Sequence, residues 1–204
     1  MYYRTDHHWT TEGAFYAYTK ISEWIKEQTE KELDPVLIDL ENYRIDTYHQ
    51  WHLGMRGQRT GAAFAGIDDY DLIYPKFETH IKKRDDGTVL SLYDALVRTD
   101  LFQKANAQNR YTYDAAYTAN DINNLVSLDA KTDLKVWLLS DSFQQAIKPY
   151  LLLTYKEFHV GGYGTLSTSF IQSNKPDVVI MLVWPGYFNE GSQFTSFVDD
   201  AAGQ

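Results

Sequence analysis

The sequence predicts an α/β protein built as a three-layer, doubly wound, mainly parallel sheet with an inserted β-hairpin region. Between residues 134 and 184, segments alternate in the order strand, helix, strand, helix, strand. The helix over residues 143–155 contains Pro149, which should kink or restart it. Residues 178–184 form a continuous apolar run, which is typical of a strand buried on both faces. Ligands of such sheets bind beyond the carboxyl ends of the strands, so a functional site is expected there.

Length and composition predict one domain spanning residues 1–204, with a hydrophobic fraction of 44% that is ordinary for a globular chain. The net charge of −9 argues against nucleic acid as a partner, because phosphate binding needs a basic face. The absence of cysteine excludes disulfides and thiolate chemistry. No segment has the length of a membrane span, which predicts a soluble domain. Residues 1–4 lead directly into a histidine motif, so further N-terminal elements are expected to precede them.

Residues 10–29 have the apolar spacing of an amphipathic helix, with Ala14, Tyr18 and Ile25 on one stripe. The Asp-His-His-Trp sequence of residues 6–9 therefore lies on the loop that enters this helix. A histidine placed there can be exposed on one side and braced on the other. The alternative is that these residues only cap the helix start.

The pattern between residues 35 and 105 is less regular. Residues 35–40 predict a strand, and residues 48–61 predict a long, glycine-rich loop. Two further segments, residues 76–82 and 88–92, predict a hairpin joined by the turn Asp-Asp-Gly at 85–87. Helical turns are expected over residues 93–105, and a weak strand over residues 122–129.

The glycine-rich loop carries a cluster of basic and aromatic side chains. His49 and His52 are three residues apart and could bind a metal, but no third ligand completes such a site, and we expect neither a metal nor a cofactor. The loop is more simply explained by packing around Trp51. Arg56 or Arg59 could bind an anionic group of a substrate.

Ser142 is the strongest candidate for chemistry. It follows the apolar run at residues 134–139 and precedes a predicted helix, so its hydroxyl lies at the carboxyl end of a strand. Free backbone N–H groups at such a turn can stabilise an oxyanion. A serine needs a base that is itself oriented by a third group, and Asp6 with His8 offers this pair. The sequence therefore predicts one Ser-His-Asp site from two distant stretches.

Residues 3–14, Tyr-Arg-Thr-Asp-His-His-Trp-Thr-Thr-Glu-Gly-Ala, resemble the signature of the DHHW family. This family is a bacterial branch of the SGNH-hydrolase-like proteins and is similar to the alginate O-acetyltransferases. Its Asp-x-His-Trp motif precedes the Asp-Ser-Phe that bears the nucleophile, and the order is the same here. Residues 51–61 resemble a Gly- and Arg-containing segment between the two motifs. The resemblance covers most of the chain and implies a flavodoxin-like sheet.

The resemblance implies a role for each residue of the triad. Ser142 would be the nucleophile that accepts an acyl group. His8 would act as the general base and then as the general acid, and Asp6 would hold the imidazole in the useful tautomer. The Asp-x-His spacing favours His8 over His7.

The oxyanion hole is where the sequence departs from the SGNH pattern. These enzymes usually carry a Gly-x-Asn-Asp block, which this sequence lacks, and Ser140 replaces the glycine usual before Asp-Ser. The backbone N–H of Ser142 would supply one donor. The candidate oxyanion or substrate-binding residues are Gly161, Gly162, Arg56, Arg59, Tyr187 and Asn189.

The activity implied by the resemblance is O-acyl transfer, of acetyl above all, on an extracytoplasmic polysaccharide or other acylated carbohydrate. A sugar hydroxyl as acceptor would make the protein a transferase, and water would make it an esterase. The implied location is the periplasm, the cell surface or the medium, with membrane association through the full-length protein. The alternative is a non-catalytic carbohydrate-binding module on a degenerate scaffold, which the 16 Tyr and 5 Trp would suit.

Overall fold

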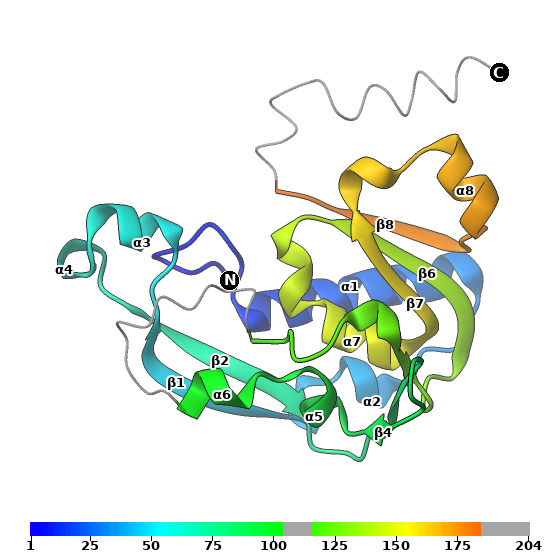
Figure 1. Cartoon of the computed structure of the whole chain (residues 1–204), viewed down its shortest axis with the longest axis horizontal. Helices are drawn as coiled ribbons and strands as arrows, with labels where there is room; N and C mark the ends of the chain where they lie inside the picture. Colours follow the sequence, from blue (N-terminus) through cyan, green and yellow to red (C-terminus); the bar gives the residue numbers. More distant parts are fainter. Residues whose placement is uncertain (104–115, 185–204) are drawn as a thin grey trace.

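The computed structural model describes residues 1–103 and 116–184. The described chain contains three sheets (Figure 1): an elongated two-stranded antiparallel ribbon, a small three-stranded antiparallel sheet, and a three-stranded parallel sheet with its helices. Neither described stretch contains a helix long and apolar enough to span a bilayer.

The parallel sheet confirms the predicted alternation of strands and helices over residues 134–184. Its strands have the order β7-β6-β8, and both pairs are parallel. Because β7 and β8 lie on opposite sides of β6, the two connections cross opposite faces of the sheet. In chain order the elements are β6 (Thr132–Ser140), the 3₁₀ turn η3 (Ser142–Ala146), α7 (Lys148–Thr154), β7 (Tyr155–Gly162), the 3₁₀ turn η4 (Tyr163–Thr165), α8 (Thr168–Asn174) and β8 (Val178–Leu182).

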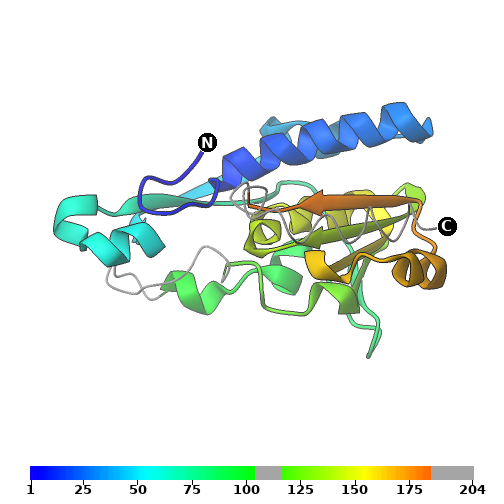
Figure 2. The ribbon, with the colours of Figure 1, turned by 90° about the horizontal axis from the view of Figure 1, so that it is seen from above.

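Alternate side chains of β6 serve the two faces of this sheet. Val136 and Leu138 are fully buried in the main core, whereas Trp137 meets Phe170 of α8 at a ring distance of 5.0 Å. Figure 2 shows α8 on the opposite side of the sheet from the long helix α1 (Thr11–Thr29). Helices therefore lie on both faces of the parallel sheet, which has three strands in the described residues.

The expected burial of residues 178–184 on both faces is wrong. In the part of the chain that the structure describes, β8 pairs only with β6, and Met181 on it remains 36% exposed. An apolar run cannot distinguish a central strand from an edge strand, because both read as continuous hydrophobic sequence.

Two helix predictions are confirmed. Helix α1 begins after Thr10, whose side chain accepts a hydrogen bond from the N–H of Gly13. The predicted helix at 143–155 is interrupted as expected: η3 ends at Ala146, and α7 restarts with Pro149 in its first turn. Proline is tolerated there because the first-turn N–H has no intrahelical partner.

The strand predicted at residues 35–40 is wrong. Residues Pro35–Ile38 form a short helix, α2, which is followed by the 3₁₀ turn η1 (Leu40–Asn42). The side chain of Asp34 accepts a hydrogen bond from the N–H of Val36, and Pro35 occupies the first turn. This Asp-Pro start signal overrides the apolar character of the segment.

The long loop predicted at residues 48–61 is also wrong. Strand β1 (Tyr43–His52) runs through its first part, and α3 (Met55–Thr60) and α4 (Ala62–Ala65) follow. Strand β1 pairs antiparallel with β2 (Asp68–Pro75), which the sequence analysis did not identify as a strand partner. Exposed residues stand on both faces of β1, including the apolar Ile45, so its pattern lacks clean alternation.

The hairpin near residue 85 is confirmed with shorter strands. Strands β3 (Ile81–Lys83) and β4 (Val89–Leu90) are antiparallel, and Gly87 in the turn has a φ of 76°. The weak strand at 122–129 becomes β5, which pairs with β3. The remaining elements here are α5 (Leu92–Leu96), α6 (Thr99–Gln103), the 3₁₀ turn η2 (Ile122–Asn124) and β5 (Leu125–Ser127).

Aromatic rings join the ribbon to the sheet region. Phe15 of α1 contacts Tyr43 of β1 at 4.8 Å and Tyr150 of α7 at 5.0 Å, and Tyr43 lies 5.7 Å from Tyr150. All three side chains are buried. This cluster fixes the N-terminal loop, which immediately precedes α1, against the carboxyl end of β6.

Candidate active site

Ser142 lies at the carboxyl end of the central strand, at the point where the chain turns into η3. Asp141 caps this turn by accepting a hydrogen bond from the N–H of Phe143 at 3.0 Å, and its other oxygen accepts one from Trp184 at 2.7 Å. The Ser140 hydroxyl donates to the carbonyl oxygen of Leu182 at 2.5 Å. Serine in place of the usual glycine therefore ties the end of β6 to the end of β8.

His8 and Asp6 meet Ser142 across 134 positions of sequence. The Nε2 atom of His8 lies 2.7 Å from the Ser142 Oγ, and its Nδ1 atom lies 3.1 Å from the Asp6 Oδ2. Asp6 is 4% exposed and His8 is 7% exposed, whereas Ser142 is only partly buried. The three side chains thus form one hydrogen-bonded chain whose serine end is open to solvent.

The loop that carries Asp6 and His8 folds back on itself before α1 begins. The N–H of Tyr3 donates to the carbonyl oxygen of His8, and the N–H of Thr10 donates to that of Met1. Trp9 forms a single antiparallel bridge with Tyr2. The sequence prediction that the motif lies on the loop entering a helix is confirmed.

Asp6 is held as a carboxylate. Burial would raise its pKa, but hydrogen bonds from His52 and His8, together with the backbone N–H of His7, outweigh burial and hold the pKa well below its usual value. An ionised carboxylate only accepts hydrogen bonds, so the Nδ1 of His8 must carry a proton. With its proton on Nδ1, the His8 imidazole presents the lone pair of Nε2 to the hydroxyl of Ser142.

His52 is the partner that the sequence analysis missed. Its Nε2 atom lies 3.2 Å from the same oxygen of Asp6 that faces His8. The sequence analysis considered His52 as part of a packed loop or as a metal ligand. The available signal was a histidine beside Trp51 and Leu53, because a histidine among large apolar residues must find a polar partner when buried.

The end of the ribbon also holds the residue before Asp6. His52 of β1 lies opposite Asp68 of β2. Both the backbone N–H and the hydroxyl of Thr5 donate to the Asp68 Oδ2 at 2.7 Å. The Thr5 hydroxyl in turn accepts a hydrogen bond from the N–H of Gly54 at 2.9 Å. Strands β1 and β2 therefore hold Thr5 and Asp6 in place through hydrogen bonds, with Asp68 binding Thr5 and His52 binding Asp6.

Gly54 allows the close approach of the two segments. A Cβ atom at this position would lie 2.3 Å from the Asp6 Cβ and 2.6 Å from the Thr5 carbonyl oxygen. The backbone of Gly54 is extended, with a φ of −69°, so contact distance rather than conformation requires glycine here. The N–H of Gly57 adds a hydrogen bond to the Thr5 carbonyl oxygen.

The glycines proposed for the oxyanion hole lie at the predicted edge of the sheet. Gly161 and Gly162 end β7, opposite Leu139 and Ser140 of β6. No heavy atom lies within 4 Å of where a Cβ of Gly162 would be, so this position faces open space. These glycines and Ser142 thus share the carboxyl edge of the sheet.

The two arginines lie on α3, beside the ribbon end. Arg56 is close enough to His7 to lower its pKa, whereas Arg59 makes its described contact with the sulfur of Met55 at 3.8 Å. Of the two arginines, Arg56 is thus the one whose charge acts on the Asp-His-His motif. The other two candidates, Tyr187 and Asn189, lie outside the described residues.

His7 lies over His8, with their rings 4.0 Å apart. Burial, and secondly the charge of His8, lower the pKa of His7. Asp6, His7 and His8 each offer a ligand atom within 4.8 Å of the others, but both ring nitrogens of His8 are engaged, by Asp6 and by Ser142, so this histidine does not serve as a cation ligand in this arrangement. His49 and His52 do not converge: His49 is exposed and pairs with Asp69 at 2.8 Å.

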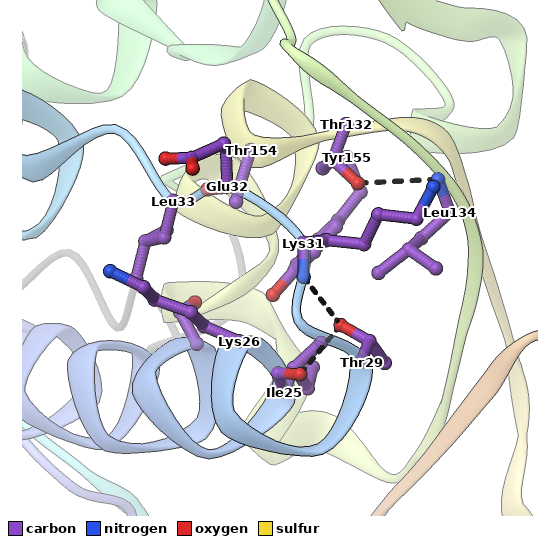
Figure 3. Close-up of a pocket in the computed structure, with 11 residues that line it drawn as sticks. Ile25, Lys26, Thr29, Lys31, Glu32, Leu33, Thr132, Leu134, Thr154 and Tyr155 are labelled. Carbon is purple, nitrogen blue, oxygen red and sulfur yellow. Dashed lines mark hydrogen bonds between the residues drawn. The ribbon is translucent and has the colours of Figure 1, made fainter.

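A small pocket lies between the end of α1 and the start of β6 (Figure 3), and none of the proposed site residues lines it. Thr29 accepts a hydrogen bond from the N–H of Lys31 at its rim. The volume of this pocket, about 10 Å³, is enough for roughly one water molecule. The pocket is therefore too small to be a substrate site.

No protein-family model matches the chain, and no curated protein matches it in sequence. Solved structures match in fold. PatB1 from Bacillus cereus is 24% identical with a TM-score of 0.62, over 90% of this chain and 62% of that one. A structure of PatB1 with a sulfonyl adduct is also 24% identical, with a TM-score of 0.58, over 90% of this chain and 60% of that one. A DHHW family protein from Eubacterium siraeum is 18% identical, with a TM-score of 0.58, over 89% of this chain and 58% of that one.

The chain thus spans about three-fifths of the length of these structures. The match to a DHHW family protein confirms the resemblance found in the sequence at the level of the fold.

Proposed function

We propose that this chain transfers or removes an acetyl group at oxygen through an acyl-Ser142 intermediate. The observation that carries the proposal is the hydrogen bond of 2.7 Å between the His8 Nε2 and the Ser142 Oγ, with Asp6 behind the imidazole. The likeness in fold to PatB1 and to a DHHW family protein, at 24% and 18% identity, supports the scaffold that the resemblance implies. Fold alone does not define chemistry, so the proposal rests on the side chains.

The first half-reaction forms the acyl enzyme. His8 takes the hydroxyl proton of Ser142 as the Oγ attacks the acyl carbonyl carbon, and a tetrahedral oxyanion forms. The backbone N–H of Ser142, with that of Gly161 or Gly162, would donate to this oxyanion. The C–O bond to the leaving group then breaks, and His8 returns its proton to the departing oxygen. Asp6 stabilises the imidazolium and does not itself take up the proton.

The second half-reaction restores the serine. His8 removes a proton from an acceptor hydroxyl, whose oxygen attacks the acyl carbon. The bond to the Ser142 Oγ breaks, and His8 returns the proton to it. A sugar hydroxyl as acceptor gives a transferase, and water gives an esterase. By resemblance we favour an extracytoplasmic polysaccharide as the acceptor. We also propose that residues 1–204 form a single SGNH-like domain.

The alternative of a non-catalytic carbohydrate-binding module is less well supported. A binding module has no need of an ionised carboxylate that orients a histidine toward a solvent-accessible serine. The contact between His8 and Ser142 at 2.7 Å therefore favours the enzyme.

The test is turnover of a chromogenic acetyl ester, p-nitrophenyl acetate, by wild type, Ser142→Ala and Ser169→Ala. Ser169 is an exposed serine on α8 and serves as the matched control. We expect turnover by wild type and Ser169→Ala, and none above background by Ser142→Ala. Equal turnover by Ser142→Ala and wild type would remove Ser142 from the mechanism and overturn the proposal.

A further inference from the structure

We propose that His52 is a positioning residue, which fixes the Asp6 carboxylate and through it His8; this inference rests on the proposed function. The Asp6 Oδ2 lies 3.2 Å from the His52 Nε2 and 3.1 Å from the His8 Nδ1. One oxygen thus accepts from two imidazoles, one on the N-terminal loop and one at the end of β1. The hydrogen-bonded chain has four members rather than three.

The protonation state of His52 follows from its surroundings. Because Asp6 is an acceptor only, the His52 Nε2 must carry a proton. The other ring nitrogen, Nδ1, is buried and has no hydrogen-bond partner. The single hydrogen bond of the His52 ring therefore goes to Asp6.

Packing prevents the ring from leaving this position. His52 is 0% exposed, and its ring lies 4.6 Å from that of Tyr3 and 6.3 Å from that of Tyr70. Its backbone belongs to β1, opposite Asp68 of β2. A side chain held in this way fixes the position of the carboxylate rather than following it.

The groups around Asp6 determine what the loss of this donor would do. His7 and His8 face Asp6 from its own loop, His52 faces it from β1, and Arg56 of α3 acts on His7. Burial opposes ionisation of Asp6, and the His52 hydrogen bond is the leading interaction that favours it. Without that donor, Asp6 takes up a proton at a less acidic pH.

A pair of variants of similar length separates the hydrogen bond from packing. In His52→Gln, the amide nitrogen reaches as far as the imidazole Nε2 and still donates to Asp6. In His52→Met, a side chain of similar length fills the space without a donor. The measurement is the rate constant for covalent labelling of the protein by phenylmethanesulfonyl fluoride, followed by intact mass, which requires no knowledge of the natural acceptor.

We expect His52→Met to label about 10- to 100-fold more slowly than wild type, by analogy with other outer-shell partners that orient a reactive side chain. His52→Gln should stay within about threefold of wild type, since its donor is retained. His49→Met is the matched control, because His49 is a 79% exposed histidine on the same strand, also paired with an aspartate. It should label at the wild-type rate.

The pH dependence provides a readout that loss of packing would not change. On acidification, the labelling rate of His52→Met should fall at a less acidic pH than that of wild type, because Asp6 without the His52 donor takes up a proton more readily. The relative rate of His52→Gln should stay constant. If His52→Met does not fold, His52→Asn, whose amide is too short to reach Asp6, replaces it with the same expectation.

The outcomes are distinguishable. Wild-type labelling of Ser142 with an equal rate in His52→Met would overturn the role of His52 and leave the proposed function standing. Equal losses of labelling rate in His52→Met and His52→Gln, independent of pH relative to wild type, would show that His52 acts through packing. That result would also overturn its positioning role. If wild type acquires on Ser142 neither a sulfonyl group from phenylmethanesulfonyl fluoride nor an acetyl group from p-nitrophenyl acetate, the proposed function fails, and the role of His52 fails with it.

Discussion

The two ends of the proposed site are held by different forces. Ser142 follows a central strand whose inward side chains, Val136 and Leu138, are fully buried in the core. Asp6 and His8 lie on a loop without regular structure, held by hydrogen bonds to the end of the β1–β2 ribbon. Apolar packing positions the nucleophile, and a short series of polar contacts positions the base.

This difference has a physical consequence. Apolar burial is distributed over many contacts and mainly sets stability. A hydrogen bond to a buried charge is directional, and its loss moves or neutralises that charge. Changes at the ribbon end should therefore reduce the reaction rate more than stability, and changes in β6 should do the reverse.

The largest effect is expected from Asp6→Asn. An amide at this position no longer fixes the proton of His8 on Nδ1, so labelling of Ser142 should fall about 10³- to 10⁴-fold. The measurement is the labelling rate with the sulfonyl fluoride, compared with Asp69→Asn, which alters the exposed aspartate that pairs with His49. A wild-type rate in Asp6→Asn would leave Asp6 as a residue of the helix start only.

A smaller loss of rate is expected from Gly54→Ala. The added methyl group would overlap the Asp6 Cβ and the Thr5 carbonyl oxygen, and neither can rotate away. A displacement of about 1 Å should lower the labelling rate roughly 10²-fold. Gly164→Ala is the matched control, since nothing lies within 4 Å of its added methyl. Equal rates in the two variants would contradict the close approach at Gly54.

The sheet should respond in the opposite way. Leu138→Ala removes a fully buried side chain from the centre of β6 and should lower the free energy of unfolding by about 2–5 kcal/mol. Urea denaturation measures this change, with Met181→Ala on the partly exposed edge strand as the control. The labelling rate per folded molecule should be unchanged. A large loss of that rate would mean that the nucleophile also depends on single contacts.

The smallest effect is expected from Ser140→Ala. This change removes the hydrogen bond to the Leu182 carbonyl oxygen and should cost about 0.5–1.5 kcal/mol of stability. Thermal or urea unfolding would detect it, and labelling of Ser142 should continue. Abolished labelling with normal stability would instead place Ser140 within the reactive machinery.

Sequence analysis succeeded where local pattern and tertiary packing agree. The parallel strands, the turn at Ser142 and helix α1 carry dense apolar periodicity, so their existence could be predicted. The pairing of Asp6, His8 and Ser142 was predicted from the chemistry that a serine nucleophile requires and from the resemblance of residues 3–14, and not from local pattern, because 134 positions separate the serine from the histidine.

The ribbon end could not be predicted for the opposite reason. Strand β1 mixes charged and aromatic side chains, and its partner β2 begins sixteen residues after β1 ends, beyond two short helices. The roles of His52 and Asp68 arise from their register across the ribbon, which no local pattern reports. A buried polar cluster is specified by tertiary contacts, so its members look like ordinary loop residues in sequence.

The most direct test of the central claim is peptide mapping of wild type after brief exposure to p-nitrophenyl acetate and acid quenching. We expect one acetyl group on the wild-type peptide that contains Ser142. This acetylation should be absent from Ser142→Ala and strongly reduced in Asp6→Asn. A well-folded wild type that hydrolyses the ester with the acetyl group on another residue, or that acquires neither an acetyl nor a sulfonyl group, would contradict covalent catalysis by Ser142.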